Sequence, residues 1–244
     1  MIIDSHQHFG GCFVFDHHVS EEELIGAMDE NNVDASLVMP FPGTYKEKQV
    51  HDAIEELGRK YPGRIYGMIS INPHCDYDSY MQEVERCVKK GFKALKIHPL
   101  GHACPVTTKD SDKVFEAAHT FKLPLLIHTG LGAPYALPAV AIPRARQYPD
   151  MKIVLCHAGA YIFSGEAELV AQDCPNIYLE TSWVGAPHRV KSFVKKLGAE
   201  RVMFGSDMTN NIANELGKYR SIKELSKDEL DMCLAGTAKE VFKI

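Results

Sequence analysis

Histidines stand at the ends of short apolar segments along this chain of 244 residues. Such a distribution is unlike that of scattered surface histidines. Five of the twelve histidines and one aspartate occupy these places: His6, His8, His98, His128, His157 and Asp207.

The spacing of His6 and His8 suits chelation of one metal ion. Alternate side chains of a strand point to the same face, with α-carbons about 6–7 Å apart, so both imidazoles can reach one ion. The pair alone is a weak signal, and His128 and Asp207 on other segments strengthen it. Three imidazoles and one carboxylate suit zinc and leave room for a bound water, as in a catalytic site.

The elements that position these residues follow a repeating pattern. Short β-rich segments alternate with stretches of helical periodicity, which predicts βα units. The expected strands are Ile2–His6, Ala35–Phe41, Ile65–Ile71, Ala94–His98, Leu125–His128, Ile153–His157, Ile177–Thr181 and Val202–Gly205. The expected helices include Glu21–Asn31, Val50–Lys60, Tyr80–Lys90, Ser111–Phe121 and His188–Leu197.

Eight such units predict a closed parallel (β/α)8 TIM barrel, an α/β fold that takes up residues 1–244 as a single domain. In this fold catalytic residues come from the C-terminal ends of several strands, where the histidines stand. An open doubly wound sheet is the alternative. It would normally carry a glycine-rich phosphate turn, and the sequence has no Gly-x-Gly-x-x-Gly.

Composition narrows the class of protein. Hydrophobic residues make up 45% and charged residues 24%, and the net charge is −5 without a basic run, so we expect no nucleic-acid partner. No apolar stretch approaches the roughly 20 residues of a membrane span. The start of the chain lacks the features of a signal peptide. Seven widely spaced cysteines without Cys-x-x-Cys are typical of reduced thiols, so we expect a cytoplasmic protein.

The motifs together resemble the amidohydrolase superfamily. Within it, the chain looks most like the amidohydrolase-related group that contains aminocarboxymuconate-semialdehyde decarboxylase and the resorcylate-type decarboxylases. The resemblance covers essentially the whole chain and rests on the opening Ile-Asp-Ser-His-Gln-His, Lys96-Ile-His-Pro, His128-Thr-Gly, His157-Ala-Gly and Gly205-Ser-Asp207. Two positions depart from the pattern: Cys156 stands where glycine is expected, and Thr237 where asparagine is usual.

The resemblance implies roles for these residues. It makes His6, His8, His128 and Asp207 the metal ligands, and His157 the residue that moves protons or polarises the substrate. Asp207 would also take a proton from a metal-bound water.

The implied first function is metal-dependent hydrolysis of a small amide, lactone or ester. The alternative is non-oxidative decarboxylation of a small unsaturated or aromatic acid, and a third is a barrel that only binds a ligand. The expected cofactor is one divalent ion, zinc first and manganese or iron next. The expected partner is a small-molecule substrate, and a homo-oligomer stays open.

Two neighbours of the ligand set have open roles. Asp4 shares a face with His6 but lies deeper, so we expect it to support the site rather than bind metal. Lys96 shares a face with His98, and an outward lysine would be pressed against apolar helices, so we expect it to point inward. A carbamate on Lys96 would permit two ions, as in binuclear members of the superfamily, but we expect one.

The walls of the site are less defined by sequence. The loop Phe9–Val19 and two aromatic residues are candidates for the pocket wall: Phe13, Phe15, His17, His18, Tyr135 and Trp183. Several basic side chains are candidate anchors for a substrate carboxylate: Lys46, His74, His102, Arg144, Arg146 and Arg189. Each of these residues also fits ordinary packing or a solvated surface.

Overall fold

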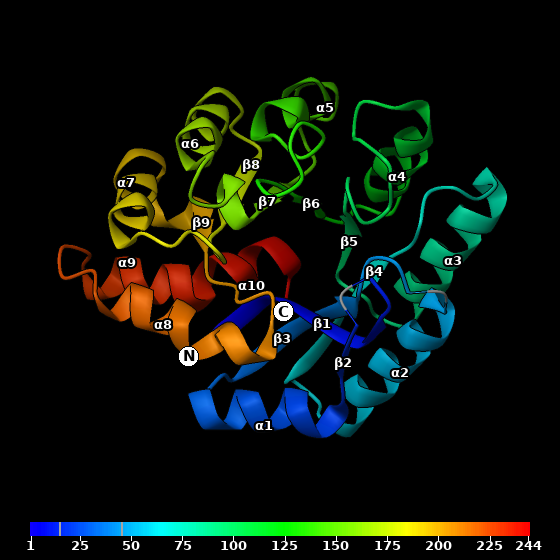
Figure 1. The fold of residues 1–244 in the computed structure, drawn as a ribbon, viewed down its shortest axis with the longest axis horizontal. Helices are drawn as coiled ribbons and strands as arrows, with labels where there is room; N and C mark the ends of the chain where they lie inside the picture. Colours follow the sequence, from blue (N-terminus) through cyan, green and yellow to red (C-terminus); the bar gives the residue numbers. More distant parts are fainter. Residues whose placement is uncertain (15, 45) are drawn as a thin grey trace.

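The computed structural model describes residues 1–14, 16–44 and 46–244. Their strands form one nine-stranded sheet in the order β2-β1-β3-β4-β5-β6-β7-β8-β9, curled inside a ring of helices (Figure 1). All neighbouring strands pair in parallel except β1 and β2. The strands are β1 (Ile3–Cys12), β2 (His17–Val19), β3 (Ala35–Pro40), β4 (Ile65–Ser70), β5 (Ala94–Ile97), β6 (Leu125–His128), β7 (Ile153–Cys156), β8 (Ile177–Glu180) and β9 (Val202–Met203).

The sheet closes on itself just beyond β9. Gln7 and Asp207 form a parallel bridge. The amide N–H of Asp207 donates to the carbonyl of His6 at 2.7 Å, and the amide of Ser5 donates to the carbonyl of Phe204 at 3.2 Å. These bonds join β1 to the end of the last strand, which confirms the predicted TIM-barrel architecture.

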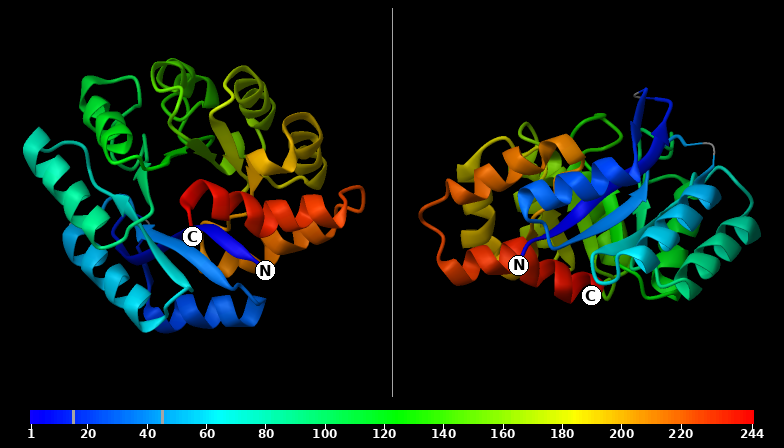
Figure 2. Two further views of the ribbon diagram at one scale, coloured as in Figure 1. Left: turned by 180° about the vertical axis from the view of Figure 1, so that it is seen from behind. Right: turned by 90° about the horizontal axis from the view of Figure 1, so that it is seen from below.

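Helices follow the strands and cover the outer face of the sheet, except that the last helix packs against the core inside the barrel through Ala238, Val241 and Phe242 (Figures 1 and 2). They are α1 (Glu21–Asn31), α2 (Glu47–Lys60), α3 (Tyr77–Lys89), α4 (Lys109–Thr120), α5 (Ile142–Gln147), α6 (Ser164–Asp173), α7 (Pro187–Leu197), α8 (Ile212–Arg220), α9 (Lys227–Asp231) and α10 (Thr237–Phe242). Side-chain caps fix three of the starts, since Ser20, Asp76 and Ser226 accept the amides of Glu23, Ser79 and Glu229. In the described part of the chain no helix has the length and apolarity needed to cross a membrane.

The strand residues alternate between two cores. Leu125 and Ile127 of β6 belong to the core between the sheet and the helices. Leu126 belongs to a second core inside the barrel, so His128, two residues further on, points inward as well. The same alternation in β5 places Leu95 and Ile97 outward and Lys96 inward, as expected. Inward residues at the strand ends are therefore the ones that reach the barrel mouth.

The first strand is longer than predicted. Most of the expected loop Phe9–Val19 is the rest of β1 and its antiparallel partner β2, which pairs Cys12 with His17. This hairpin rises at the end of the molecule away from both termini (Figure 2). The prediction missed it because a hairpin outside the barrel follows no βα repeat. Phe15, predicted as a wall residue, lies outside the described residues.

Candidate metal centre and active site

A pocket of about 290 Å³ opens at the C-terminal ends of the strands. All the predicted site residues except His6 line it, and His6 lies fully buried beside them. The lining residues are His8, Phe41, Pro42, His98, Leu100, His128, Leu131, His157, Trp183, Asp207 and Met208. Residues in β1 and in or after β3, β5, β6, β7, β8 and β9 thus supply its walls.

Three atoms of the predicted ligand set converge at the base of this pocket. The Nε2 atoms of His6 and His8 lie 3.2 Å and 3.3 Å from Oδ1 of Asp207. Nδ1 of His6 lies 2.8 Å from Oε2 of Glu180, and Nδ1 of His8 lies 3.2 Å from the carbonyl oxygen of Pro40. A carbonyl can only accept, and a carboxylate accepts when ionised, so each Nδ1 donates and carries the ring proton.

The consequence is a set of acceptors that face one another. With the protons on Nδ1, the Nε2 atoms of His6 and His8 present lone pairs toward the Asp207 carboxylate. Burial and the nearby ammonium of Lys96 hold the pKa of His6 well below its usual value, so this ring stays neutral. Each imidazole nitrogen thus lies at a distance from the carboxylate oxygen that suits two ligands of one divalent cation, and these donor types suit such a cation.

Lys96 lies next to this set. Its side chain is fully buried, and its Nζ lies 3.0 Å from Nε2 of His6 and 3.1 Å from Sγ of Cys156. Among the described residues, no hydrogen bond or ion pair joins Lys96 to Asp4. Asp4 instead accepts the backbone amides of His6 and Ser206 at 3.1 Å and 3.0 Å, so it supports the closure of the barrel. Burial raises the pKa of the Asp4 carboxyl to about 7.

His157 lies at the centre of a second hydrogen-bonded group. Its Nδ1 lies 2.7 Å from Oγ of Ser182, its Nε2 lies 3.0 Å from Nδ1 of His128, and its amide donates to Oε2 of Glu180. Burial holds the pKa of His157 well below the usual value. The group therefore links the pocket wall to the buried Glu180 carboxylate through exchangeable protons.

His128 departs from the predicted ligand arrangement. Its Nδ1 faces His157, and its Nε2 donates to the carbonyl oxygen of Leu131 at 2.8 Å. Both ring nitrogens are thus occupied. Among the described residues, three groups have donor atoms that all lie within 4.8 Å of one another, and the one that reaches the pocket consists of His6, His157 and Asp207. The other two groups are His6, Cys156 and Glu180, and His51, Glu83 and Cys87. His128 can become a ligand only by giving up one of its two partners.

Strained backbone marks the same residues. His157, Trp183 and Asp207 have positive φ angles of 63°, 60° and 70°. This left-handed region is unfavourable for side chains other than glycine and is often found at functional sites. The turn at Trp183 lets its Nε1 donate to Oδ2 of Asp207 at 2.8 Å, which fixes the carboxylate and leaves Oδ1 facing the histidines.

Sequence reasoning missed Glu180 and Ser182. Glu180 accepts hydrogen bonds from the side chains of His6 and Ser182 and from the amides of His157 and Ser182. The available signal was an acidic residue within an apolar segment, in register with inward positions, because Ile177 and Leu179 point outward. A lone buried carboxylate at such a place requires donors around it.

Most of the candidate wall and anchor residues lie elsewhere. Trp183 lines the pocket, whereas Phe13, His17, His18 and Lys46 line another hollow beside the hairpin. Arg144, Arg146 and His74 pair with surface carboxylates, and His102 is buried behind His98. Tyr135 and Arg189 do not line the pocket either. Among the described residues, therefore, no lysine or arginine lines it.

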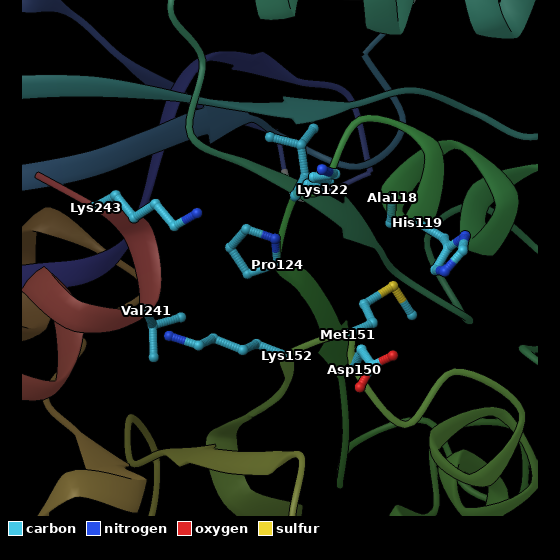
Figure 3. A pocket seen from close by; sticks show the side chains of 10 residues that line it. Ala118, His119, Lys122, Pro124, Asp150, Met151, Lys152, Val241 and Lys243 are labelled. Atoms are coloured by element: carbon cyan, nitrogen blue, oxygen red, sulfur yellow. The ribbon is translucent and has the colours of Figure 1, made fainter.

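A larger hollow of about 410 Å³ lies at the opposite end of the barrel. Figure 3 shows Lys122, Lys152 and Lys243 around Pro124 and Met151. These residues precede β6 and β7 or follow α10, so the hollow lies where strands begin. Active sites of TIM barrels lie at the other end, and none of the clustered metal-ligating groups lines this hollow. The smaller pocket is the candidate site.

Comparison with known proteins bears on the family and the fold. The sequence model of the amidohydrolase family matches residues 14–244, whereas no curated protein sequence matches the chain. The structure of 5-carboxyvanillate decarboxylase from Sphingomonas paucimobilis is similar, with 17% identity, a TM-score of 0.79, and coverage of 100% of this chain and 99% of that chain.

Two further solved structures contain manganese. The 5-carboxyvanillate decarboxylase from Novosphingobium aromaticivorans, in complex with 4-hydroxy-3-methoxy-5-nitrobenzoic acid, has 17% identity and a TM-score of 0.80. The match covers 100% of this chain and 96% of that chain. The dihydroxybenzoic acid decarboxylase from Polaromonas sp. JS666, in complex with the inhibitor 2-nitroresorcinol, has 17% identity and a TM-score of 0.77. The match covers 99% of this chain and 96% of that chain. At these identities the likeness shows the fold.

The prediction of a hydrolase as the first function is wrong. The three similar structures described above are decarboxylases of aromatic acids, which matches the alternative instead. The physical reason for the error is that both reactions use one set of strand-end ligands. The sequence motifs identify the metal ligands but not the residues of the pocket wall. The wall residues determine which substrate binds and therefore which reaction takes place.

Proposed function

This chain belongs to the amidohydrolase family, and from that premise we propose that it is a metal-dependent, non-oxidative decarboxylase of a small aromatic or unsaturated carboxylic acid. One observation carries the proposal. The convergent acceptors of His6, His8 and Asp207 lie at the base of a pocket whose other walls are mainly apolar. The named activities of the similar structures support the same reaction class.

The proposed metal site holds one divalent ion between Nε2 of His6, Nε2 of His8 and Oδ1 of Asp207. His128 would join as a fourth ligand after releasing the carbonyl of Leu131. The donor set accepts zinc or manganese, and the manganese in two similar structures favours manganese. Once bound, the ion would supply positive charge that orients the substrate and stabilises negative charge during the reaction.

The proposed reaction breaks the bond between the carboxylate carbon and the carbon that bears it. Carbon dioxide leaves, the electron pair stays on the substrate carbon, and that carbon takes up one proton. His157 is the proposed proton donor, because it lines the pocket and shares a proton with His128. Ser182 and Glu180 behind it hold the ring in place, and a proton from solvent restores His157 after the transfer.

The apolar walls favour decarboxylation over hydrolysis. Decarboxylation turns a carboxylate into neutral carbon dioxide, and an apolar environment disfavours the charged starting group more than the neutral product. Phe41, Leu100 and Met208 supply such surroundings. Hydrolysis would need a place for a polar leaving group, and the described walls offer few polar atoms beyond the histidines and Asp207.

The test is carbon dioxide release by protein loaded with manganese or zinc. A panel of hydroxybenzoic, methoxybenzoic and unsaturated acids is offered, with matched esters, lactones and amides as hydrolase substrates. We expect release from at least one acid, and deuterium at the carbon that lost its carboxylate when the reaction runs in D₂O. Hydrolysis of an ester, lactone or amide without carbon dioxide from any acid would overturn the proposal.

A further inference from the structure

His98 is one of the histidines at the strand ends, but it belongs neither to the proposed metal ligands nor to the residues proposed to transfer the proton. Nδ1 of His98 accepts the backbone N–H of Gly101 at 2.9 Å. A nitrogen that accepts a hydrogen bond carries no proton, so the ring proton is on Nε2. His98 is thus a neutral imidazole with a fixed direction of donation.

The surrounding turn holds the ring in this state. Gly101 packs so tightly that a Cβ there would lie 2.5 Å from Cβ of Pro42. The amide of His98 donates to Nδ1 of the buried His102 at 3.2 Å, and the amide of His102 donates back to the carbonyl of His98 at 2.8 Å. The ring stacks on that of His128 with 3.7 Å between centroids and 16° between planes. Rotation of the ring would break the hydrogen bond from Gly101 and the stacking on His128, while the bonds to His102 hold the backbone of the turn.

Nε2 of His98 has no protein partner among the described residues, and the ring lines the pocket. The other donors of the pocket wall are committed. Nε1 of Trp183 donates to Asp207, Nε2 of His128 donates to Leu131, and the remaining nitrogens of His128 and His157 meet each other. His98 is therefore the uncommitted donor of the described wall.

The rest of the wall limits what the substrate can carry. The described lining residues include no lysine, arginine, serine, threonine, tyrosine, asparagine or glutamine. A second charged group on the substrate would lie unpaired against apolar side chains, which disfavours its binding. Phe41, Leu100 and Leu131 instead offer surfaces for a flat apolar body.

We propose that His98 binds the substrate by donating its Nε2 hydrogen to an oxygen beside the carboxylate, and that the pocket selects flat monocarboxylates without a second charged group. A ring hydroxyl or carbonyl next to the carboxylate is the matching acceptor. The inference rests on the proposed function, since it takes the metal-bound pocket as the substrate site, and it adds the substrate class to it.

The test compares ligand binding by zinc-loaded wild-type protein and two variants. The probes are 2-hydroxybenzoate, which has the neighbouring oxygen, benzoate, which lacks it, and benzene-1,3-dicarboxylate, which adds a charge. We expect wild-type protein to bind 2-hydroxybenzoate about tenfold more tightly than benzoate, the effect of one hydrogen bond. The dicarboxylate should bind at least tenfold more weakly than benzoate.

The variants separate recognition from folding. His98→Leu removes the donor and should bring 2-hydroxybenzoate and benzoate to equal affinity, with metal content unchanged. His98→Gln keeps an N–H near the Nε2 position and should restore part of the preference. Nitrogen-15 NMR of zinc-loaded wild-type protein should report the Nε2–H form of His98 directly, even if His98→Leu does not fold.

Three results would overturn the inference: an unchanged preference in His98→Leu, tight binding of the dicarboxylate, or a proton on Nδ1 of His98. The proposed function fails separately. If the ligand preferences hold but no acid releases carbon dioxide, the site binds as inferred and the reaction class is wrong. If carbon dioxide is released and His98→Leu behaves like wild type, only the role of His98 is wrong.

Discussion

Glu180→Gln tests whether the buried carboxylate prepares His6 to bind metal. The wild-type carboxylate accepts four hydrogen bonds, one of them from Nδ1 of His6 at 2.8 Å. It thereby keeps the proton on Nδ1 and the lone pair of Nε2 toward the metal position. The change keeps the size of the side chain and removes its charge and one acceptor.

The structure limits how much the Glu180→Gln change can weaken metal binding. If the glutamine NH₂ takes the place of Oε1, it faces the amide of Ser182, and His6 keeps a neutral acceptor. If the NH₂ takes the place of Oε2, it faces donors from His6 and His157, and His6 must move its proton to Nε2, which blocks the metal. The first orientation costs less, so we expect metal affinity to fall about tenfold, the lower end of the usual 10–100-fold range, or about 1.4 kcal/mol.

The assay is competition for manganese and for zinc against a chromophoric chelator at pH 7.5. Ser182→Ala is the matched control. It removes a donor to Glu180 and the Nδ1 partner of His157 but leaves the bond between Glu180 and His6, so metal affinity should stay within about threefold of wild type. Thermal unfolding of both metal-free variants checks the fold. If folded Glu180→Gln bound both metals as tightly as wild type, the carboxylate would not control His6, and the reasoning would fail.

Three further outcomes follow from the structure. His157→Asn should lower kcat at least about 100-fold while metal content, measured by elemental analysis, stays unchanged; a normal rate would remove His157 from the proton path. Lys96→Met should leave one equivalent of metal and bind it more tightly, because it removes an ammonium 3.0 Å from Nε2 of His6; loss of a second equivalent would instead reveal a binuclear site. Burial alone would raise the pKa of Glu83, but its bonds to His51 and Arg86 lower it to about 2. Since the unfolded value is about 4.3, this bond network stabilises the fold above that pH and loses its effect as pH falls toward 2. Glu83→Gln should therefore lose about 2 kcal/mol in urea unfolding at pH 7, with a difference that shrinks below pH 4, and a difference independent of pH would contradict the assignment.

The barrel could be predicted because its signal is local. Each strand is a short apolar run in which alternate residues face two different cores, so the sequence fixes which side chains point inward. This is why Lys96 and His128 lie inside as expected. The β1–β2 hairpin could not be predicted this way, because it pairs outside the barrel.

The site was only partly predictable for a related reason. The spacing of His6 and His8 puts both on one face, and strand order brings Asp207 to them. The partners of these residues depend instead on rotamers and turns. The hydrogen bonds of His128 with Leu131 and of His98 with Gly101 are made by loop residues, and these loops follow no periodic sequence pattern. The reaction class depends on such loops as well, which explains why the ligand motif led to hydrolysis.

The number of metal ions follows from the partners that each residue already has. A second ion near Lys96 would need ligands beyond the first set, and Cys156, His128 and His157 are the nearby candidates. Burial raises the pKa of the Cys156 thiol to about 12, so it stays protonated and binds metal poorly. His128 and His157 hold each other at 3.0 Å, and their other nitrogens are held by Leu131 and Ser182. A second ion would have to take its ligands from this bonded group. The first ion displaces Lys96 from Nε2 of His6, and it breaks only the bond of His128 to Leu131 if His128 joins. We therefore propose a single-ion site.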